Sequence, residues 1–122
     1  MDLSDAHHAA AVQTLARPDL TFVVAALALA EVLYFVGIRL GTRAESGLLR
    51  GLSEWDVQAP APEDWNRIGE LVEKYGDFPL GGVDASIVAL AERLDAPRVL
   101  TFDYRHFRAI RPSHCEQFEL LP

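Results

Sequence analysis

Residues 20–38 form a long apolar run with a single charged side chain, Glu31, and this run limits how the chain can fold. Its length approaches that of a membrane-spanning helix. However, a carboxylate near the centre of such a helix costs on the order of 3 kcal/mol on membrane insertion. We therefore expect a buried helix of a globular domain. A small membrane-anchored protein that spans residues 20–38 is the alternative.

The composition fits one globular domain in a reducing compartment. The chain has 122 residues, 50% of them hydrophobic, and a formal net charge of −7. Because an acidic protein repels nucleic acid at long range, binding to RNA would require local basic groups or bound cations. The single cysteine, Cys115, cannot form an internal disulfide, which fits the cytoplasm. The N-terminus lacks the pattern of a secretory signal peptide.

Short apolar segments alternate with segments of helical periodicity. The predicted strands cover residues 21–24, 55–59, 98–102 and 117–121. The predicted helices cover residues 4–16, 26–40, 42–52, 62–75 and 83–94, and a short turn or helix follows Asp103. This alternation favours an α/β fold with a parallel sheet covered on both faces.

Two helices have specific signals. Residues 26–40 are apolar nearly all round, which predicts a helix buried on several sides. Gly41 is expected to end that helix. Thr42 and Glu45 have the spacing of a capping box, which predicts the start of the next helix.

Glu31 is the most informative single residue, because every residue near it in sequence is apolar. A buried carboxylate is costly unless it is paired or coordinates a metal. The functional interpretation is a metal ligand. The alternatives are a salt bridge to an arginine, or an exposed stripe on a helix that is less buried than its composition predicts.

Asp84 and Asp103 are the other candidate acids. Asp84 lies in the first turn of a predicted helix, where an aspartate is also ordinary capping and dipole chemistry. Asp103 follows a predicted strand, where the alternative is a turn-forming aspartate. Ligands bind beyond the carboxyl ends of parallel strands. Carboxylates gathered there suit Mg²⁺ and metal-assisted phosphodiester hydrolysis.

The three candidate acids lie in residues 30–34 (AEVLY), 75–94 (YGDFPLGGVDASIVALAERL) and 100–107 (LTFDYRHF). Together these segments resemble VapC-type toxins of the PIN-domain family, in the family's order and approximate spacing. The resemblance implies a five-stranded parallel sheet with helices on both faces. It also implies one or two Mg²⁺ or Mn²⁺ ions, endoribonuclease activity on RNA, and inhibition by a cognate antitoxin. We expect a homodimer and no membrane association.

The resemblance also implies roles for individual residues. Glu31, Asp84 and Asp103 match the catalytic, metal-binding carboxylates of the family. Thr101 matches a hydroxyl position beside the last acid. Arg105 and His106 are candidates to contact RNA phosphates. They belong to a basic cluster with Arg108, Arg111 and His114, for which the alternative is a solvated basic face.

The family's first strand, which ends in an aspartate, has no counterpart here. Asp2 and Asp5 do not follow an apolar run, so we assign the role of the first site aspartate to neither residue. We therefore expect a single PIN-like domain over residues 1–122 that is N-terminally truncated relative to the family, through a shortened gene or a misassigned start. The alternative to a ribonuclease is a catalytically impaired PIN remnant that acts through antitoxin binding or dimerisation.

Overall fold

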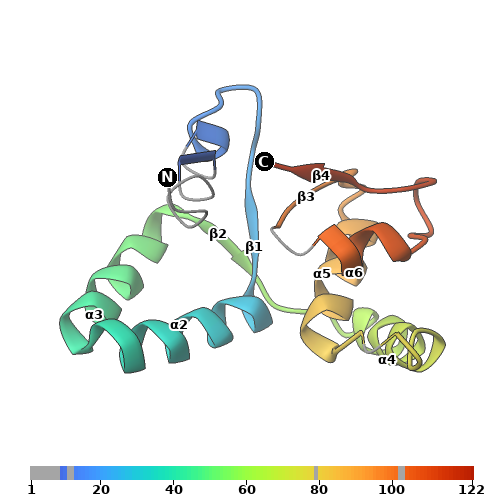
Figure 1. The fold of residues 1–122 in the computed structure, drawn as a ribbon, viewed down its shortest axis with the longest axis horizontal. Helices are drawn as coiled ribbons and strands as arrows, with labels where there is room; N and C mark the ends of the chain where they lie inside the picture. Colours follow the sequence, from blue (N-terminus) through green and yellow to red (C-terminus); the bar gives the residue numbers. More distant parts are fainter. Residues whose placement is uncertain (1–8, 11–12, 79, 102–103) are drawn as a thin grey trace. The chain divides into compact units, whose positions relative to one another are not determined.

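The structure is a computed structural model and describes residues 9–10, 13–78, 80–101 and 104–122 (Figure 1). The chain divides into two compact units. One comprises Met1–Thr21 and Ala91–Pro122, and is called the terminal unit below. The other is Phe22–Leu90, the central unit.

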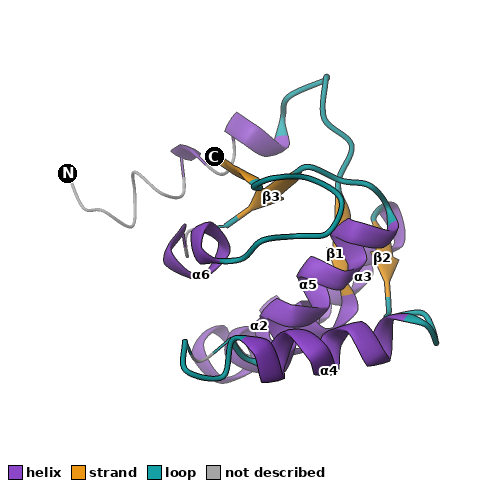
Figure 2. Ribbon diagram, turned by 90° about the vertical axis from the view of Figure 1, so that its right-hand side faces the viewer, coloured by secondary structure: helices purple, strands orange, loops and turns teal. Residues whose placement is uncertain are grey.

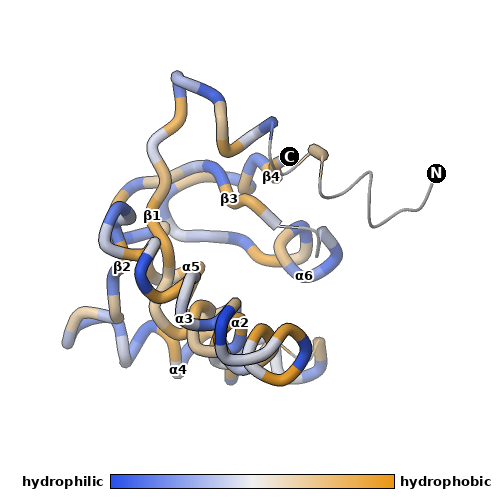
Figure 3. The backbone as a smooth tube through the Cα atoms, turned by 90° about the vertical axis from the view of Figure 1, so that its left-hand side faces the viewer, coloured by the Kyte–Doolittle hydropathy of each residue, from blue (hydrophilic) through white to orange (hydrophobic). Residues whose placement is uncertain are grey.

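The central unit contains a parallel pair of short strands. β1 (Val23–Ala25) pairs with β2 (Asp56–Gln58), with Val24 opposite Val57. Figure 3 shows β1 as a hydrophobic segment, as expected for β-branched residues in a strand. Parallel strands require a long crossover connection. Here the crossover contains α2 (Ala26–Leu40), α3 (Thr42–Gly51) and a 3₁₀ turn, η1 (Leu52–Glu54).

A glycine turn joins α2 to α3, and α3 turns back from the end of α2 in Figure 1. Gly41 has φ 90°, a conformation that favours glycine, and its N–H donates to the carbonyl of Val36 at 3.2 Å. The predicted capping box is wrong, because Gly41 is the N-cap residue and no side chain caps α3. The Glu45 carboxylate lies instead where a Cβ on Gly37 would be, so Gly37 allows this close approach between the two helices.

The burial predicted for α2 is also wrong. None of its residues is buried, and Phe35 and Ile38 are 56% and 63% exposed. Val32, Tyr34 and Leu40 of this helix are exposed as well. Within the described part of the chain, no helix is long and apolar enough to cross a membrane.

Two further helices supply most of the buried apolar side chains of the central unit. α4 (Asp64–Lys74) buries Ile68 and Leu71. α5 (Gly82–Arg93) begins in the central unit and is rich in small residues, which allow close packing. The buried apolar residues of this unit are Ile68, Leu71, Leu80, Ala85, Val88, Ala89 and Leu90.

The terminal unit contains the second parallel pair. β3 (Arg98–Leu100) pairs with β4 (Glu119–Leu121), and α6 (Tyr104–Ala109) lies between them in sequence (Figure 2). The rings of Phe107 and Phe118 meet edge to face with centroids 6.4 Å apart. Such aromatic contacts contribute beyond the area they bury. The other buried apolar residues of this unit are Ala91, Val99, Ile110 and Leu121.

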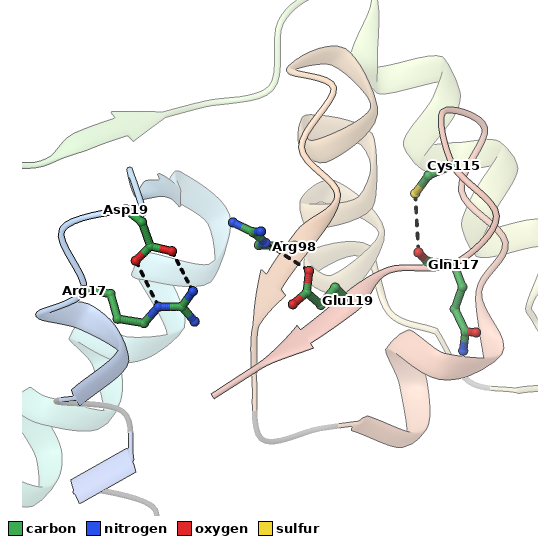
Figure 4. Close-up of polar contacts among 6 residues, drawn as sticks. All are labelled: Arg17, Asp19, Arg98, Cys115, Gln117 and Glu119. Carbon is green, nitrogen blue, oxygen red and sulfur yellow. Dashed lines mark hydrogen bonds and ion pairs between the residues drawn. The ribbon is translucent and has the colours of Figure 1, made fainter.

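Two exposed ion pairs lie on the terminal unit (Figure 4). Arg17 donates to Asp19, with a shortest distance of 2.7 Å, and Arg98 pairs with Glu119 across β3 and β4 at 3.0 Å. The hydrogen bond with Asp19 raises the pKa of Arg17, and the same bond lowers the pKa of Asp19. Because both pairs are exposed to water, each contributes little to stability.

The sequence therefore predicted the class of fold correctly. The described residues form four short strands in two parallel pairs, and helices separate the strands along the chain. The predicted boundaries are shifted by one or two residues, as at β1, which was expected at residues 21–24. The single domain over residues 1–122 and the truncated first strand stay predictions.

Candidate functional site

Asp84 is held at the start of a well-packed helix. It is half-buried in the first turn of α5, and Ala85 and Ser86 directly after it are buried. The Ser86 hydroxyl donates to the carbonyl of Val83 at 2.6 Å, within the same turn. Negative charge is favoured at this end of a helix. The position therefore suits a carboxylate whose backbone is fixed in place.

Glu31 lies in the middle of α2, and its side chain is exposed. Tyr34, Phe35 and Ile38, at helical spacing from it, are also exposed. Of the interpretations open for Glu31, this placement fits a carboxylate within an exposed apolar stripe. It also leaves the carboxylate accessible to a cation or to a ligand.

Thr101 follows the last residue of β3. Its N–H donates to the carbonyl of Leu121 at 2.8 Å, which extends the contact between β3 and β4 by one residue. The backbone at Thr101 is therefore fixed at the carboxyl end of β3. Asp103, which the sequence predicts to be the last acid of the site, lies outside the described residues.

Arg105 and His106 lie on α6. Arg105 is exposed and His106 is half-buried. The helix is anchored by Phe107, which is fully buried. Both candidate RNA-contacting residues therefore lie on a helix fixed by an aromatic anchor.

His114 was expected in the same basic cluster, but its surroundings are different. Its Nε2 lies 2.7 Å from the carbonyl of Ala96, and its ring lies 5.6 Å from that of Phe118. Its Nδ1 is buried without a hydrogen-bond partner in the described part of the chain. His114 therefore packs within the terminal unit. Its contact with Ala96 joins residues 18 apart in sequence, which the local pattern could not reveal.

The predicted site residues are distributed over both units. Glu31 and Asp84 belong to the central unit, and Thr101, Arg105 and His106 belong to the terminal unit. Among the described residues, no three His, Cys, Asp or Glu side chains gather in a group that could hold a metal ion.

Comparison with known proteins identifies the family. The PIN domain model matches residues 3–111 of the chain. Ribonuclease VapC26 of Mycobacterium tuberculosis is 32% identical over 123 aligned positions, which cover 99% of this chain and 91% of that protein. Both matches agree with the family predicted from the three sequence segments. The chain therefore belongs to the PIN-domain family, and its likeness to VapC26 places it with the VapC-type members.

Proposed function

We propose that this protein is a metal-dependent endoribonuclease that hydrolyses RNA phosphodiester bonds. The observation that supports this most is the likeness to a VapC ribonuclease along 99% of the chain. Family membership alone does not define a reaction, because one fold can serve several chemistries. The proposal therefore also depends on the chemistry of the candidate site residues.

The proposed metal ligands are Glu31, Asp84 and Asp103. Their carboxylates fit Mg²⁺ or Mn²⁺, which prefer oxygen ligands. A divalent cation, when bound, supplies the Lewis acidity that phosphodiester hydrolysis needs. Asp84 would be the most rigid ligand, because Ala85 and Ser86 directly after it are buried. Glu31 would approach the cation from an exposed helix face.

The proposed substrate contacts are Thr101, Arg105 and His106. The Thr101 hydroxyl would donate to a phosphate oxygen, and the Arg105 guanidinium would pair with a neighbouring phosphate. His106 would add a ring nitrogen as a hydrogen-bond donor. These contacts would position the RNA backbone and would not select its sequence.

A cognate antitoxin and a second copy of the chain are the proposed protein partners, and the cytoplasm is the proposed location. The exposed apolar stripe of α2 supports a protein partner, since exposed apolar patches commonly mark interaction sites. The same stripe supports the second candidate function, a PIN remnant that binds an antitoxin or dimerises without cleaving RNA.

RNA cleavage by the purified full chain tests the proposal. We expect cleavage with Mg²⁺ or Mn²⁺ and none after chelation by EDTA. The double variant Asp84→Asn/Asp103→Asn should cleave RNA at least about a hundredfold more slowly. The reason is that the metal ion that stabilises the transition state would lose two of its proposed carboxylate ligands.

Asp95→Asn is the matched control for this experiment. Asp95 is exposed just after α5 and has φ 53°, a conformation that asparagine also adopts readily. The control should cleave RNA like the parent chain. Cleavage that survives in the double variant would refute the metal assignment. A parent chain that dimerises but cleaves no RNA with either metal would favour the remnant.

A further inference from the structure

The segment from Tyr104 to Cys115 has a charge opposite to that of the whole chain. It contains Arg105, Arg108 and Arg111 together with two histidines, and no aspartate or glutamate. The whole chain has 18 acidic and 11 basic residues. A polyanion repelled by most of the protein would therefore find a local region of positive charge here.

α6 directs these charges outward. Phe107 and Ile110 are fully buried, whereas Arg105, Arg108 and Arg111 are exposed. Arg105 and Arg108 are three residues apart on α6 and lie on the same side of the helix, and Arg111 follows two residues after the helix ends. The alternation of hydrophobic and hydrophilic colour along α6 is visible in Figure 3. We call Arg105, Arg108 and Arg111 the arginine face.

Local contacts pre-order two members of this face. The Arg108 guanidinium lies over the ring of Tyr104, 5.3 Å from its centroid. The Nη1 of Arg111 donates to the carbonyl of Arg108 at 3.1 Å. Less side-chain freedom is lost on binding when a side chain is already ordered.

Arg108 differs from two other arginines of the same unit. Arg17 and Arg98 are each paired with a carboxylate, Asp19 and Glu119, which neutralises their charge locally. Arg108 instead contacts a neutral aromatic ring, which keeps its positive charge available to an outside anion. A planar guanidinium is well suited to bind a phosphate with two donors.

We propose that Arg108 and Arg111 form a phosphate-binding track for single-stranded RNA, which extends the contacts of Arg105 along α6. This inference rests on the proposed ribonuclease function. The track would bind backbone phosphates of nucleotides beyond the one that is cleaved. It would therefore set affinity and salt dependence, with no effect on the choice of bases.

Fluorescence anisotropy with a labelled single-stranded RNA tests the proposal. The full chain with Asp84→Asn serves as the parent, so that the RNA remains uncut. We expect Arg108→Gln/Arg111→Gln to weaken binding about tenfold. Each lost phosphate contact should reduce the slope of log K against log salt by about 0.7, so the double variant should lose about 1.4.

Two further variants separate a specific contact from total charge and from folding. Arg43→Gln/Arg50→Gln removes the same charge from two exposed arginines of α3 and should bind RNA within about twofold of the parent. Arg108→Lys/Arg111→Lys keeps both charges and should retain the salt slope. Melting temperatures of all variants establish that each is folded.

The outcomes distinguish this proposal from the proposed function. Equal weakening by the α3 and α6 double variants would mean that only total charge matters, and would overturn the track. Parent-like binding by Arg108→Gln/Arg111→Gln would also overturn it, while RNA cleavage by the unmutated chain would still support the ribonuclease. A chain that neither binds nor cleaves RNA would refute both.

Discussion

α2 and α5 are both apolar helices of similar length, yet only α5 is buried. α5 buries its Ala85, Val88, Ala89 and Leu90, whereas α2 buries no residue. Each helix also contains one of the proposed site acids, Asp84 in α5 and Glu31 in α2. α2 is the more apolar of the two helices, so composition does not explain the difference, which lies instead in the elements that cover each helix.

This comparison shows that apolar composition predicts a helix better than it predicts the helix's surroundings. Removing apolar area from water stabilises a protein only where another element covers that area. In α5 the small side chains allow close packing, so its apolar residues contribute to folding. In α2 several large apolar side chains, such as Phe35 and Ile38, are exposed and available to a partner.

Matched leucine substitutions test the comparison most strongly. Leu90 in α5 is 7% exposed and Leu40 in α2 is 68% exposed. Leu90→Ala should lower the free energy of unfolding by about 2–5 kcal/mol, since it leaves a cavity. Leu40→Ala should change it by less than about 0.5 kcal/mol. Urea unfolding monitored by circular dichroism measures both. Similar losses for the two variants would mean that α2 is covered in solution.

The sequence predicted positions along the chain better than contacts between distant residues. Helical periodicity and the turn at Gly41 fixed the bounds of α3 and α5 to within about two residues. The same pattern could not tell which side of α2 would find neighbours. Glu45 was expected to cap its own helix, but it lies against Gly37. That contact depends on how two helices meet, which local propensity does not specify.

The candidate site shows the same limit. Sequence alone could place Asp84 at the start of a helix and Thr101 at the end of a strand, since both positions follow from local patterns. It could not predict the contact between His114 and Ala96, which lie 18 residues apart in sequence. The tyrosine contact of Arg108, by contrast, links residues four apart on one helix, a spacing that the sequence already contained.

The comparison of buried with exposed residues also applies to a polar side chain, because Asp64 at the start of α4 is buried. Its Oδ2 accepts the N–H of Ala61 at 2.9 Å, and its own N–H donates to the carbonyl of Ala61 at 2.9 Å. Asp64→Ala should lower the free energy of unfolding by about 1–2 kcal/mol, because a part-buried N–H loses its acceptor. Glu63→Ala is the control, since exposed Glu63 makes no side-chain cap. Equal effects in urea unfolding would contradict the role given to Asp64.

Glu31 should matter for metal binding and not for stability. Because its side chain is exposed, Glu31→Gln should leave the free energy of unfolding within about 0.5 kcal/mol of the parent value. If Glu31 is a metal ligand, Mn²⁺ binding measured by calorimetry should weaken by about tenfold or more. Glu54→Gln, another exposed carboxylate of the central unit, should change neither quantity. Unchanged Mn²⁺ affinity in Glu31→Gln would contradict the metal role, and Glu31 would then be only an exposed carboxylate among the apolar residues of α2.

The Arg17–Asp19 pair should give the smallest effect, because it is a fully exposed contact. The hydrogen bond from Arg17 lowers the pKa of Asp19 in the folded state. Its contribution should therefore be present above the unfolded pKa, about 4, and be lost as the pH falls through the lower folded pKa. Asp19→Asn should be slightly less stable than the parent at pH 7, and this difference should shrink as the pH falls below 4.

Asp77→Asn, which removes an exposed carboxylate from the central unit, is the control in the same denaturation series. A difference between Asp19→Asn and the parent that grows at low pH would mean that the pair does not act through the charged carboxylate.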